Sequence, residues 1–374
     1  MMKRIWILLA VCLLVLAGCA QEPLLEDAAD GTPAETAPQV TEKSCALALV
    51  AEYPGLEESA YSRAAWSGLE KAAKKKNVTA RCYHPTEISN AAGLAAINEA
   101  VENGAQLVVC AGDSYADAVY QAQYLYPQVS FIALECAPVS AENGDDTIED
   151  NVYAVYYREE QAGFLAGYAA VQEGYTKLGF LGGMAVPAAV RYGAGYLQGV
   201  NYAAEALRVP VEVRYDYCGL FYDDPAVQTE AGFWFINGTQ LIFSSNIAFT
   251  PSLIAAAESA GTMLIGVDAD HASESETMLT SVKKDLAGTV YRAALDFFAG
   301  EFTGGRVAYL GAAEGGISLE RVNDRFNKLT DAQYDAIIGS LADGTVVVRP
   351  VEDITVPLQK LVGSYVTILY EEKK

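Results

Sequence analysis

Apolar and polar positions follow two patterns along this chain. Short runs rich in β-branched and aromatic residues alternate with longer amphipathic runs, which is typical of βαβ units on a parallel sheet. In the first half, the strands are predicted at residues 45–50, 78–83, 106–110 and 129–134. Helical segments are predicted between them at residues 58–76, 89–103 and 113–126. These elements complete one α/β lobe by about residue 136.

A second series of the same kind follows an acidic connection at residues 140–150. Its strands are predicted at residues 153–156, 177–181, 211–215, 241–244 and 263–267. Residues 285–300 place Leu286, Val290, Ala293 and Phe297 on one helical face, and residues 306–310 form another predicted strand. After residue 320 the periodicity is weaker. The pattern therefore predicts two Rossmann-like lobes.

The first nineteen residues have the pattern of a lipoprotein signal. Lys3 and Arg4 precede an apolar run, residues 5–16, that is too short to span a bilayer comfortably, and small residues then lead to Cys19. We expect cleavage before Cys19, a lipid on its thiol, and an anchor on the extracytoplasmic face of the cell membrane. The alternative is an ordinary uncleaved anchor. Residues 20–43 are acidic, rich in Ala, Pro and Thr, and predict a flexible tether.

Composition excludes several classes of partner. A formal net charge of −23 argues against nucleic acid, which requires a basic groove. Beyond Cys19, the cysteines that remain have no CxxC pair and no metal-type spacing, so we expect neither a metal site nor an essential disulfide. They are Cys45, Cys82, Cys110, Cys136 and Cys218.

Motifs of the common enzymes are missing. The chain contains no HExxH, GxSxG, Walker loop or GxGxxG, so no catalytic residue is predicted. His84 and His271 are expected to be surface or capping residues. Asp268 and Asp270 follow a predicted strand, where they could coordinate a cation, act as acid and base, or accept hydrogen bonds from the hydroxyl groups of a sugar.

Other candidate features lie at strand ends. Glycines in residues 182–187 allow a tight turn before a helix, or a close approach to a ligand. Lys284 is either a solvated surface lysine or a partner of Asp268 beside a ligand. Several aromatic residues come near strand-to-helix junctions, where two facing rings could hold a flat base. These are Tyr61, Trp66, Tyr115, Phe221 and Tyr222.

An ordered set of motifs runs through both lobes. In the first lobe these are residues 64–69 (AAWSGL), 126–127 with 131–135, and 151–152 with 158–160 and 165–167. In the second they are residues 182–187 with Arg191, Gly195 and Gly199, then 265–270 (IGVDAD) and 280–284. Taken together, these segments resemble the basic membrane protein family of lipoproteins, the purine nucleoside receptors of ABC importers, and the resemblance covers most of residues 45–320.

The resemblance implies the type I periplasmic-binding architecture, with a ligand cleft between the lobes. The N-terminal lobe is expected to comprise residues 44–138 and 281–304, and the C-terminal lobe residues 150–270 and 305–345. Residues 346–374 form an extension that is assigned to neither. Hinges are expected near residues 136–152, 270–281 and 303–312.

The resemblance also implies a set of ligand-binding residues. Trp66 and one of Phe221 or Tyr222 would stack on the base, Asp268 would hold the ribose hydroxyls, and Lys284 would reach the ligand beside it. Glu135 would be a further polar contact. Two departures from the family pattern alter the base-recognising side: Glu58 and Ser62 stand where an Asp and an Asn are usual, and Ile247 and Ala248 replace a glycine pair.

We therefore expect a solute-binding lipoprotein that captures a nucleoside, with purine favoured, and delivers it to the permease subunits of an ABC importer. No cofactor is expected. The alternatives are a receptor or sensor for another flat or hydroxylated small molecule, and an extracytoplasmic nucleoside hydrolase. The hydrolase would need Asp268 and Asp270 as its general base and water-activating group.

Overall fold

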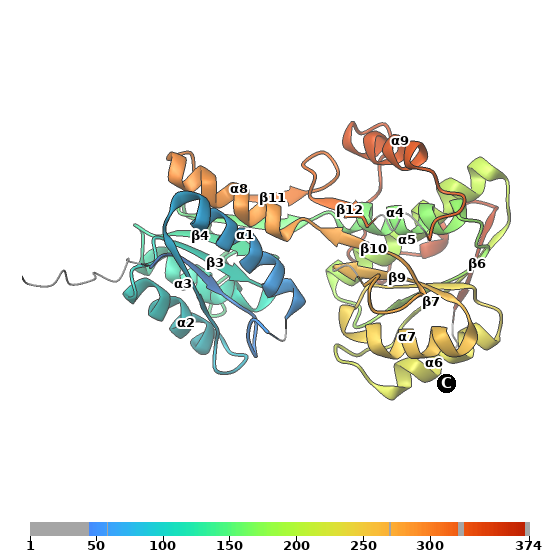
Figure 1. Ribbon diagram of the computed structural model, residues 1–374, viewed down its shortest axis with the longest axis horizontal. Coiled ribbons are helices and arrows are strands. Elements are labelled where there is room, and N and C mark those ends of the chain that lie inside the picture. Colours follow the sequence, from blue (N-terminus) through green and yellow to red (C-terminus); the bar gives the residue numbers. More distant parts are fainter. Residues whose placement is uncertain (1–44, 58, 269–270, 321–324, 371–374) are drawn as a thin grey trace, which may run out of the picture. The chain divides into compact units, whose positions relative to one another are not determined.

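The computed structural model describes residues 45–57, 59–268, 271–320 and 325–370. The predicted signal, Cys19, the tether, Glu58 and Asp270 lie outside these residues. The described chain is built on two sheets (Figure 1). No helix among the described residues has the length and apolarity needed to cross a membrane.

The first sheet has six strands in the order β11-β5-β4-β3-β1-β2, and every neighbouring pair is parallel. Its strands are β1 (Cys45–Val50), β2 (Thr79–Tyr83), β3 (Leu107–Ala111), β4 (Ser130–Leu134), β5 (Val152–Tyr157) and β11 (Arg306–Leu310). Every residue of the central strand β3 is buried. A strand covered on both faces reads as a continuous apolar run, which is why its sequence lacks alternation.

The second sheet has seven strands in the order β12-β10-β9-β8-β6-β7-β13, and only the β10–β12 pair is antiparallel. Its strands are β6 (Lys177–Gly182), β7 (Val211–Tyr217), β8 (Leu241–Ser244), β9 (Met263–Asp268), β10 (Met278–Lys284), β12 (Ile317–Leu319) and β13 (Val366–Tyr370). The α/β fold with two parallel-type sheets is therefore confirmed.

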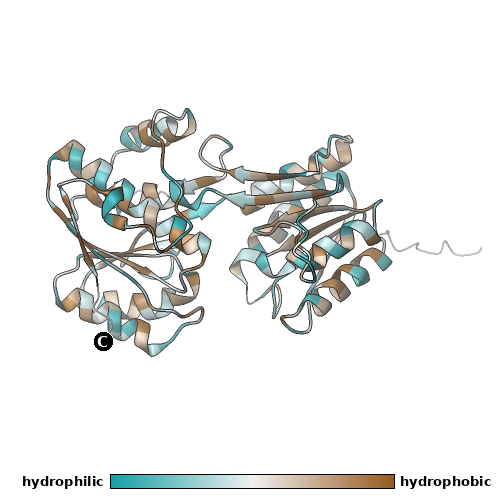
Figure 2. Ribbon diagram, turned by 180° about the vertical axis from the view of Figure 1, so that it is seen from behind, coloured by the Kyte–Doolittle hydropathy of each residue, from teal (hydrophilic) through white to brown (hydrophobic). Residues whose placement is uncertain are grey.

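Helices pack beside both sheets. Contacts group α1 (Ala60–Lys76), α2 (Asn90–Glu102), α3 (Ala116–Leu125) and α8 (Leu286–Ala299) with the first sheet. They group α4 (Glu159–Gln172), α5 (Pro187–Leu207), α6 (Pro225–Ile236), α7 (Thr250–Ala260) and α9 (Asp331–Ala342) with the second. Short 3₁₀ turns are η1 (Asp113–Tyr115), η2 (Ile247–Phe249) and η3 (Leu358–Leu361). Figure 2 shows hydrophobic residues concentrated along the strands, with mixed hydropathy on the helices.

The assignment of segments to lobes differs from the sequence-based expectation. Strands β5 and β11, expected in the C-terminal lobe, pair with each other in the first sheet. Strand β10, of which residues 281–284 were expected in the N-terminal lobe, lies in the second. The C-terminal extension supplies β13, which pairs in parallel with β7. Strand partners are selected by hydrogen bonding between segments distant in sequence, so periodicity alone does not give them.

The chain passes between the sheets at three places. They are Arg158 between β5 and α4, Asp285 between β10 and α8, and residues 311–316 between β11 and β12. These crossings are bonded together, because the amide of Arg158 donates to the carbonyl of Leu310 and that of Asp285 to Gly316. The connection at residues 136–152, expected as a hinge, instead joins two neighbouring strands of the first sheet.

Helices α4 and α5 pack unusually closely through four glycines. A Cβ on Gly163 would lie 2.1 Å from the carbonyl oxygen of Tyr192, and one on Gly167 would lie 2.2 Å from that of Tyr196. In return, a Cβ on Gly195 or Gly199 would lie 2.0 Å from a carbonyl oxygen of α4. Each helix thus presents glycines four residues apart to the backbone of the other, and no side chain fits between them.

We predict that Gly167→Ala lowers the free energy of unfolding, because the added methyl must push two buried helices apart. Overpacking of this kind costs about 1–3 kcal/mol. The control is Gly339→Ala in α9, where no atom lies within 4 Å of the added methyl, and a Gly to Ala change in a helix stabilises by roughly 0.5–1 kcal/mol. Urea unfolding of both variants measures the difference, and equal stability for the two would contradict the packing argument.

Candidate functional site

A large cavity lies at the carboxyl ends of strands from both sheets. Its volume is about 1020 Å³, and its walls carry Glu52, Glu135, Asp268 and Phe221. Glu52, Glu135 and Phe221 follow β1, β4 and β7, and Asp268 is the last residue of β9. The carboxyl edge of a parallel sheet is where open α/β folds place their ligands.

A buried lysine, Lys284, lies behind this cavity at the end of β10. Its side chain is 3 % exposed, and its Nζ lies 2.7 Å and 2.9 Å from the two carboxylate oxygens of Glu135. Nζ is also 3.0 Å from Oε1 of Glu159 and 3.9 Å from Oδ1 of Asp268. Burial alone would lower the pKa of Lys284, but Glu135 and Glu159 outweigh it and hold the pKa well above its ordinary value.

Glu159 joins this lysine to an arginine. The carboxylate begins α4 and is fully buried, and Nε of Arg191 donates to its Oε2 at 2.7 Å. Nη1 of Arg191 donates to Oε1 of Glu352, also at 2.7 Å. Burial raises the pKa of Glu159, but the charges of Lys284 and Arg191 are stronger together, so the pKa is lowered overall.

Glu135 and Asp268 share an uncommon backbone. Their φ angles are 60° and 64°, in the left-handed region that few residues other than glycine adopt. Burial raises the pKa of Glu135 despite the opposing charge of Lys284. The hydroxyl of Tyr192 donates to Oδ1 of Asp268 at 2.9 Å. Strain of this kind clusters at functional sites, and here it falls on two carboxylates that line the cavity.

Glu52 is a site residue that the sequence reasoning did not find. Its amide donates to Oγ of Ser62, and the hydroxyl of Ser59 donates to its Oε2 at 2.6 Å. Burial raises the pKa of Glu52, and the nearby charge of Asp113 adds to this effect. Its sequence position could have identified it, because Glu52 closely follows a predicted strand as Asp268 does. The argument from strand ends selected only Asp268.

Of the predicted binding residues, Glu135, Phe221 and Asp268 line the cavity. Lys284 contacts Glu135 and Asp268 from behind the wall. Ser62 is fully buried and supports the turn that carries Glu52. Tyr222 is exposed and is not among the lining residues, whereas Ile247 and Ala248 are. Glu58 lies outside the described residues.

Trp66 is the main correction to the predicted site. It lines a separate hollow with Lys71 and Val78, on the side of α1 next to β2. The aromatic residue of α1 that lines the cavity is Tyr61. The two positions are five apart in the sequence, so their side chains point in directions about 140° apart around the helix. Both therefore cannot face the same cavity.

The structure gives no support to metal or histidine chemistry among the described residues. No group of three or more His, Cys, Asp or Glu side chains there is arranged to hold a metal ion. His271 is buried and engaged at both ring nitrogens, with Glu274 at 2.8 Å and the carbonyl of Val267 at 3.2 Å. It therefore acts as a structural residue under the turn that follows β9.

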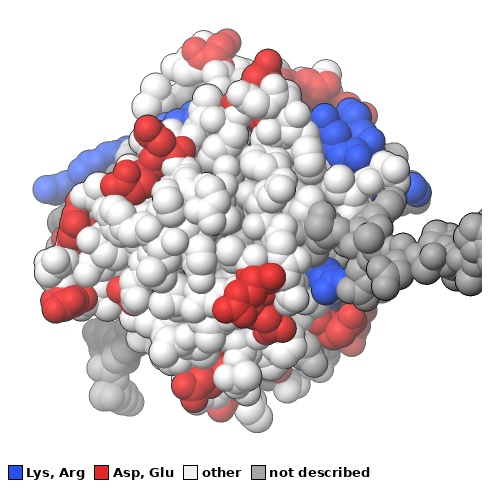
Figure 3. Space-filling view, turned by 90° about the vertical axis from the view of Figure 1, so that its left-hand side faces the viewer, with Lys and Arg blue, Asp and Glu red and all other residues white. Residues whose placement is uncertain are grey.

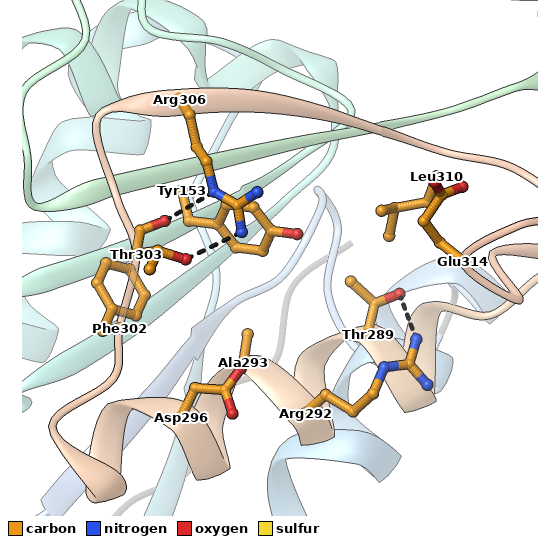
Figure 4. Close-up of a pocket in the computed structure, with 10 residues that line it drawn as sticks. All are labelled: Tyr153, Thr289, Arg292, Ala293, Asp296, Phe302, Thr303, Arg306, Leu310 and Glu314. Atoms are coloured by element: carbon orange, nitrogen blue, oxygen red, sulfur yellow. Dashed lines mark hydrogen bonds between the residues drawn. The ribbon is translucent and has the colours of Figure 1, made fainter.

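A smaller hollow of about 160 Å³ lies between β11 and α8 (Figure 4). Its two arginines are engaged locally: Arg306 donates to Thr303 and lies over the ring of Tyr153, and Arg292 pairs with Asp285. The large cavity therefore remains the candidate site. On the face seen in Figure 3, acidic residues are scattered among uncharged ones and basic residues are few, in line with the net charge of −23.

A large cavity at the strand ends of two parallel-type sheets, walled by aromatic and carboxylate side chains, defines a small-molecule binding protein. The family described as ABC transporter substrate-binding protein PnrA-like matches residues 49–342. The chain belongs to this family, which confirms the predicted resemblance.

Two curated relatives illustrate the relationship. Basic membrane protein B of Borreliella burgdorferi is 30 % identical over 59 % of this chain and 64 % of its own length. The ABC transporter nucleoside-binding protein BmpA of Lactococcus lactis is 25 % identical over 85 % of this chain and 92 % of its own length.

Solved structures show the same fold. A solute-binding protein of an ABC transporter system from Conexibacter woesei superposes with a TM-score of 0.68 at 23 % identity, covering 82 % of this chain and 99 % of its own. The corresponding protein from Aeropyrum pernix gives 0.64 at 21 % identity, covering 83 % and 94 %. These matches confirm the predicted architecture.

We predict that Lys284→Gln destabilises the protein and that the loss depends on pH. Removing the ammonium leaves Glu135 and Glu159 buried with less compensation, which costs about 3–5 kcal/mol. Their pKa values then rise, so the folded variant takes up protons as the pH falls. The loss should therefore be larger at pH 8 than at pH 5.

The matched control is Lys283→Gln. Lys283 pairs with Glu320 at a partly exposed position, where an ion pair contributes about 0–1 kcal/mol. Thermal unfolding of both variants at the two pH values provides the measurement. An equal and pH-independent loss in both would show that burial of Lys284 has no special role.

Proposed function

We propose that this protein binds a nucleoside, with purine favoured, and delivers it to an ABC importer. The observation that carries the proposal is the pairing of a strand-end carboxylate, Asp268, with aromatic side chains on the same cavity wall. A carboxylate accepts hydrogen bonds from ribose hydroxyls, and an aromatic ring stacks on a base. Membership of the substrate-binding family and likeness to a nucleoside-binding protein support this assignment.

The base is assigned to Tyr61 and Phe221, one from each side of the cavity. Tyr61 lies in the first turn of α1 beside the first sheet, and Phe221 follows β7 of the second and is 59 % exposed. An exposed aromatic ring at a cavity wall is available to a flat ligand. Glu52 and Glu135 add hydrogen-bond acceptors, which suit the amino and imino groups of a purine.

Transport would require closure around the ligand. The cavity volume lies at the upper end of the range for small-molecule sites, about 300–1000 Å³, so approach of the two walls would bury a nucleoside more completely. The bonded crossings at Arg158, Asp285 and residues 311–316 are the hinges of this motion. The closed form would be the one that the permease subunits recognise, with Cys19 carrying the lipid anchor outside the membrane.

Binding without chemical change distinguishes a receptor from the hydrolase alternative. Guanosine at a hundredfold excess over its dissociation constant should stabilise the protein by about 2.7 kcal/mol, seen as a rise in Tm. Chromatography after long incubation should recover guanosine intact. Free guanine and ribose appearing in proportion to protein would indicate an enzyme, and a Tm rise with other hydroxylated ligands alone would indicate a different receptor.

We predict that Asp268→Asn weakens guanosine binding about tenfold or more and leaves guanine binding nearly unchanged. The substitution keeps the shape but removes charge-assisted hydrogen bonds to ribose, each contributing roughly 1.5–3 kcal/mol. Titration calorimetry with both ligands gives the comparison. The control is Asp146→Asn, an equal charge change at an exposed position away from the cavity. Parallel losses for guanosine and guanine would remove Asp268 from the ribose site.

A further inference from the structure

The C-terminal segment reaches the cavity by running along one stripe of α5. The amide of Arg349 and its carbonyl bond the side chain of Gln198, both at 2.9 Å, and the amide of Gly363 donates to Asn201 at 2.6 Å. Val351, between these anchors, is buried. The segment therefore runs toward the start of α5 and returns to form β13, and we call residues 343–365 the C-terminal loop.

Glu352 lies near the start of α5, where the C-terminal loop turns back, and it lines the cavity. Its carboxylate accepts from Nη1 of Arg191 at 2.7 Å, while its side chain remains 60 % exposed. The match to the family ends at residue 342, so the loop is a feature that family membership does not assign. Arg191 and Glu352, which are 161 positions apart in the sequence, therefore share one wall of the site.

Arg191 and Arg63 are the basic side chains among the described residues that line this cavity. Arg191 is held between Glu159 and Glu352, so one positive charge faces two negative ones. Such a group does not attract an anion, although an isolated guanidinium is a preferred partner of phosphate. The rest of the wall carries Glu52, Asp113, Glu135 and Asp268. Arg63 donates to the carbonyl of Glu57, and acidic side chains outnumber the two arginines on the wall, so a phosphorylated ligand would meet a net negative charge.

We infer that Glu352 is a specificity residue: by occupying Arg191, it keeps phosphorylated nucleosides out of the site while neutral nucleosides bind. This inference rests on the proposed function and adds which members of the ligand class are excluded. Discrimination of this kind comes from a repulsive element set against the wrong ligand. Glu352 also holds the guanidinium in place, which leaves Nη2 of Arg191 to donate to an oxygen of the neutral ligand.

The test compares guanosine with guanosine 5′-monophosphate on the wild-type protein and on Glu352→Gln. In the variant, Arg191 loses one of its two carboxylate partners, so the monophosphate should bind more tightly and guanosine slightly less tightly. We expect the dissociation constant of the monophosphate divided by that of guanosine to fall by about fivefold or more in the variant, with a smaller change at high salt. Glu352→Asp, which retains the carboxylate, should restore much of the wild-type ratio.

The matched control is Asp353→Asn, the same loss of charge one residue further along the C-terminal loop. Asp353 bonds the amide of Thr355 and does not line the cavity, so its ratio should equal that of the wild type. A wild-type ratio in Glu352→Gln, or equal narrowing in both variants, would overturn the inference and leave the nucleoside proposal standing. Failure of the wild-type protein to bind guanosine would overturn both. Circular dichroism verifies that each variant folds.

Discussion

The structure depends on the burial of one ammonium group. Lys284 ends a strand of the second sheet, whereas Glu135 directly follows a strand of the first and Glu159 begins the helix that follows a crossing between them. Burying either carboxylate as an anion is costly without this cation, and burying the cation is costly without them. The mutual requirement brings three separate strand and helix ends to one place, at the edge of the cavity and beside the crossings.

Close packing of α4 on α5 extends this arrangement toward the surface. Glycines allow the backbones of the two helices to touch, and Glu159 and Arg191, each near the start of its helix, are thereby held at bonding distance. Arg191 then meets Glu352 from the C-terminal loop. A continuous series of ion pairs thus runs from the buried lysine to an exposed carboxylate, so packing deep in the protein sets the charge that a ligand meets at the wall.

The α/β pattern could be predicted from the sequence because strands and helices are recorded in local periodicity. The strands Cys45–Val50, Leu241–Ser244 and Arg306–Leu310 lie where they were predicted, and others differ by one or two residues at their ends. Strands β10 and β13 were not found. Part of the first falls in a segment expected as a hinge, and the second lies where periodicity is weak. Pairing defines both strands, β10 with β9 and β12 and β13 with β7.

The sequence by itself determined that acidic residues end or follow strands, and this was enough to select Asp268, whereas Glu135 came from the family resemblance. It did not determine which aromatic residue of α1 faces the cavity, because Tyr61 and Trp66 differ only in their angle around the helix and the sheet decides which side is inside. Nor could it show that Arg191 lies between Glu159 and Glu352, or that Lys284 is buried. Local sequence patterns reflect interactions between residues that are close along the chain. Charge pairing and burial depend on residues that only the folded chain brings together.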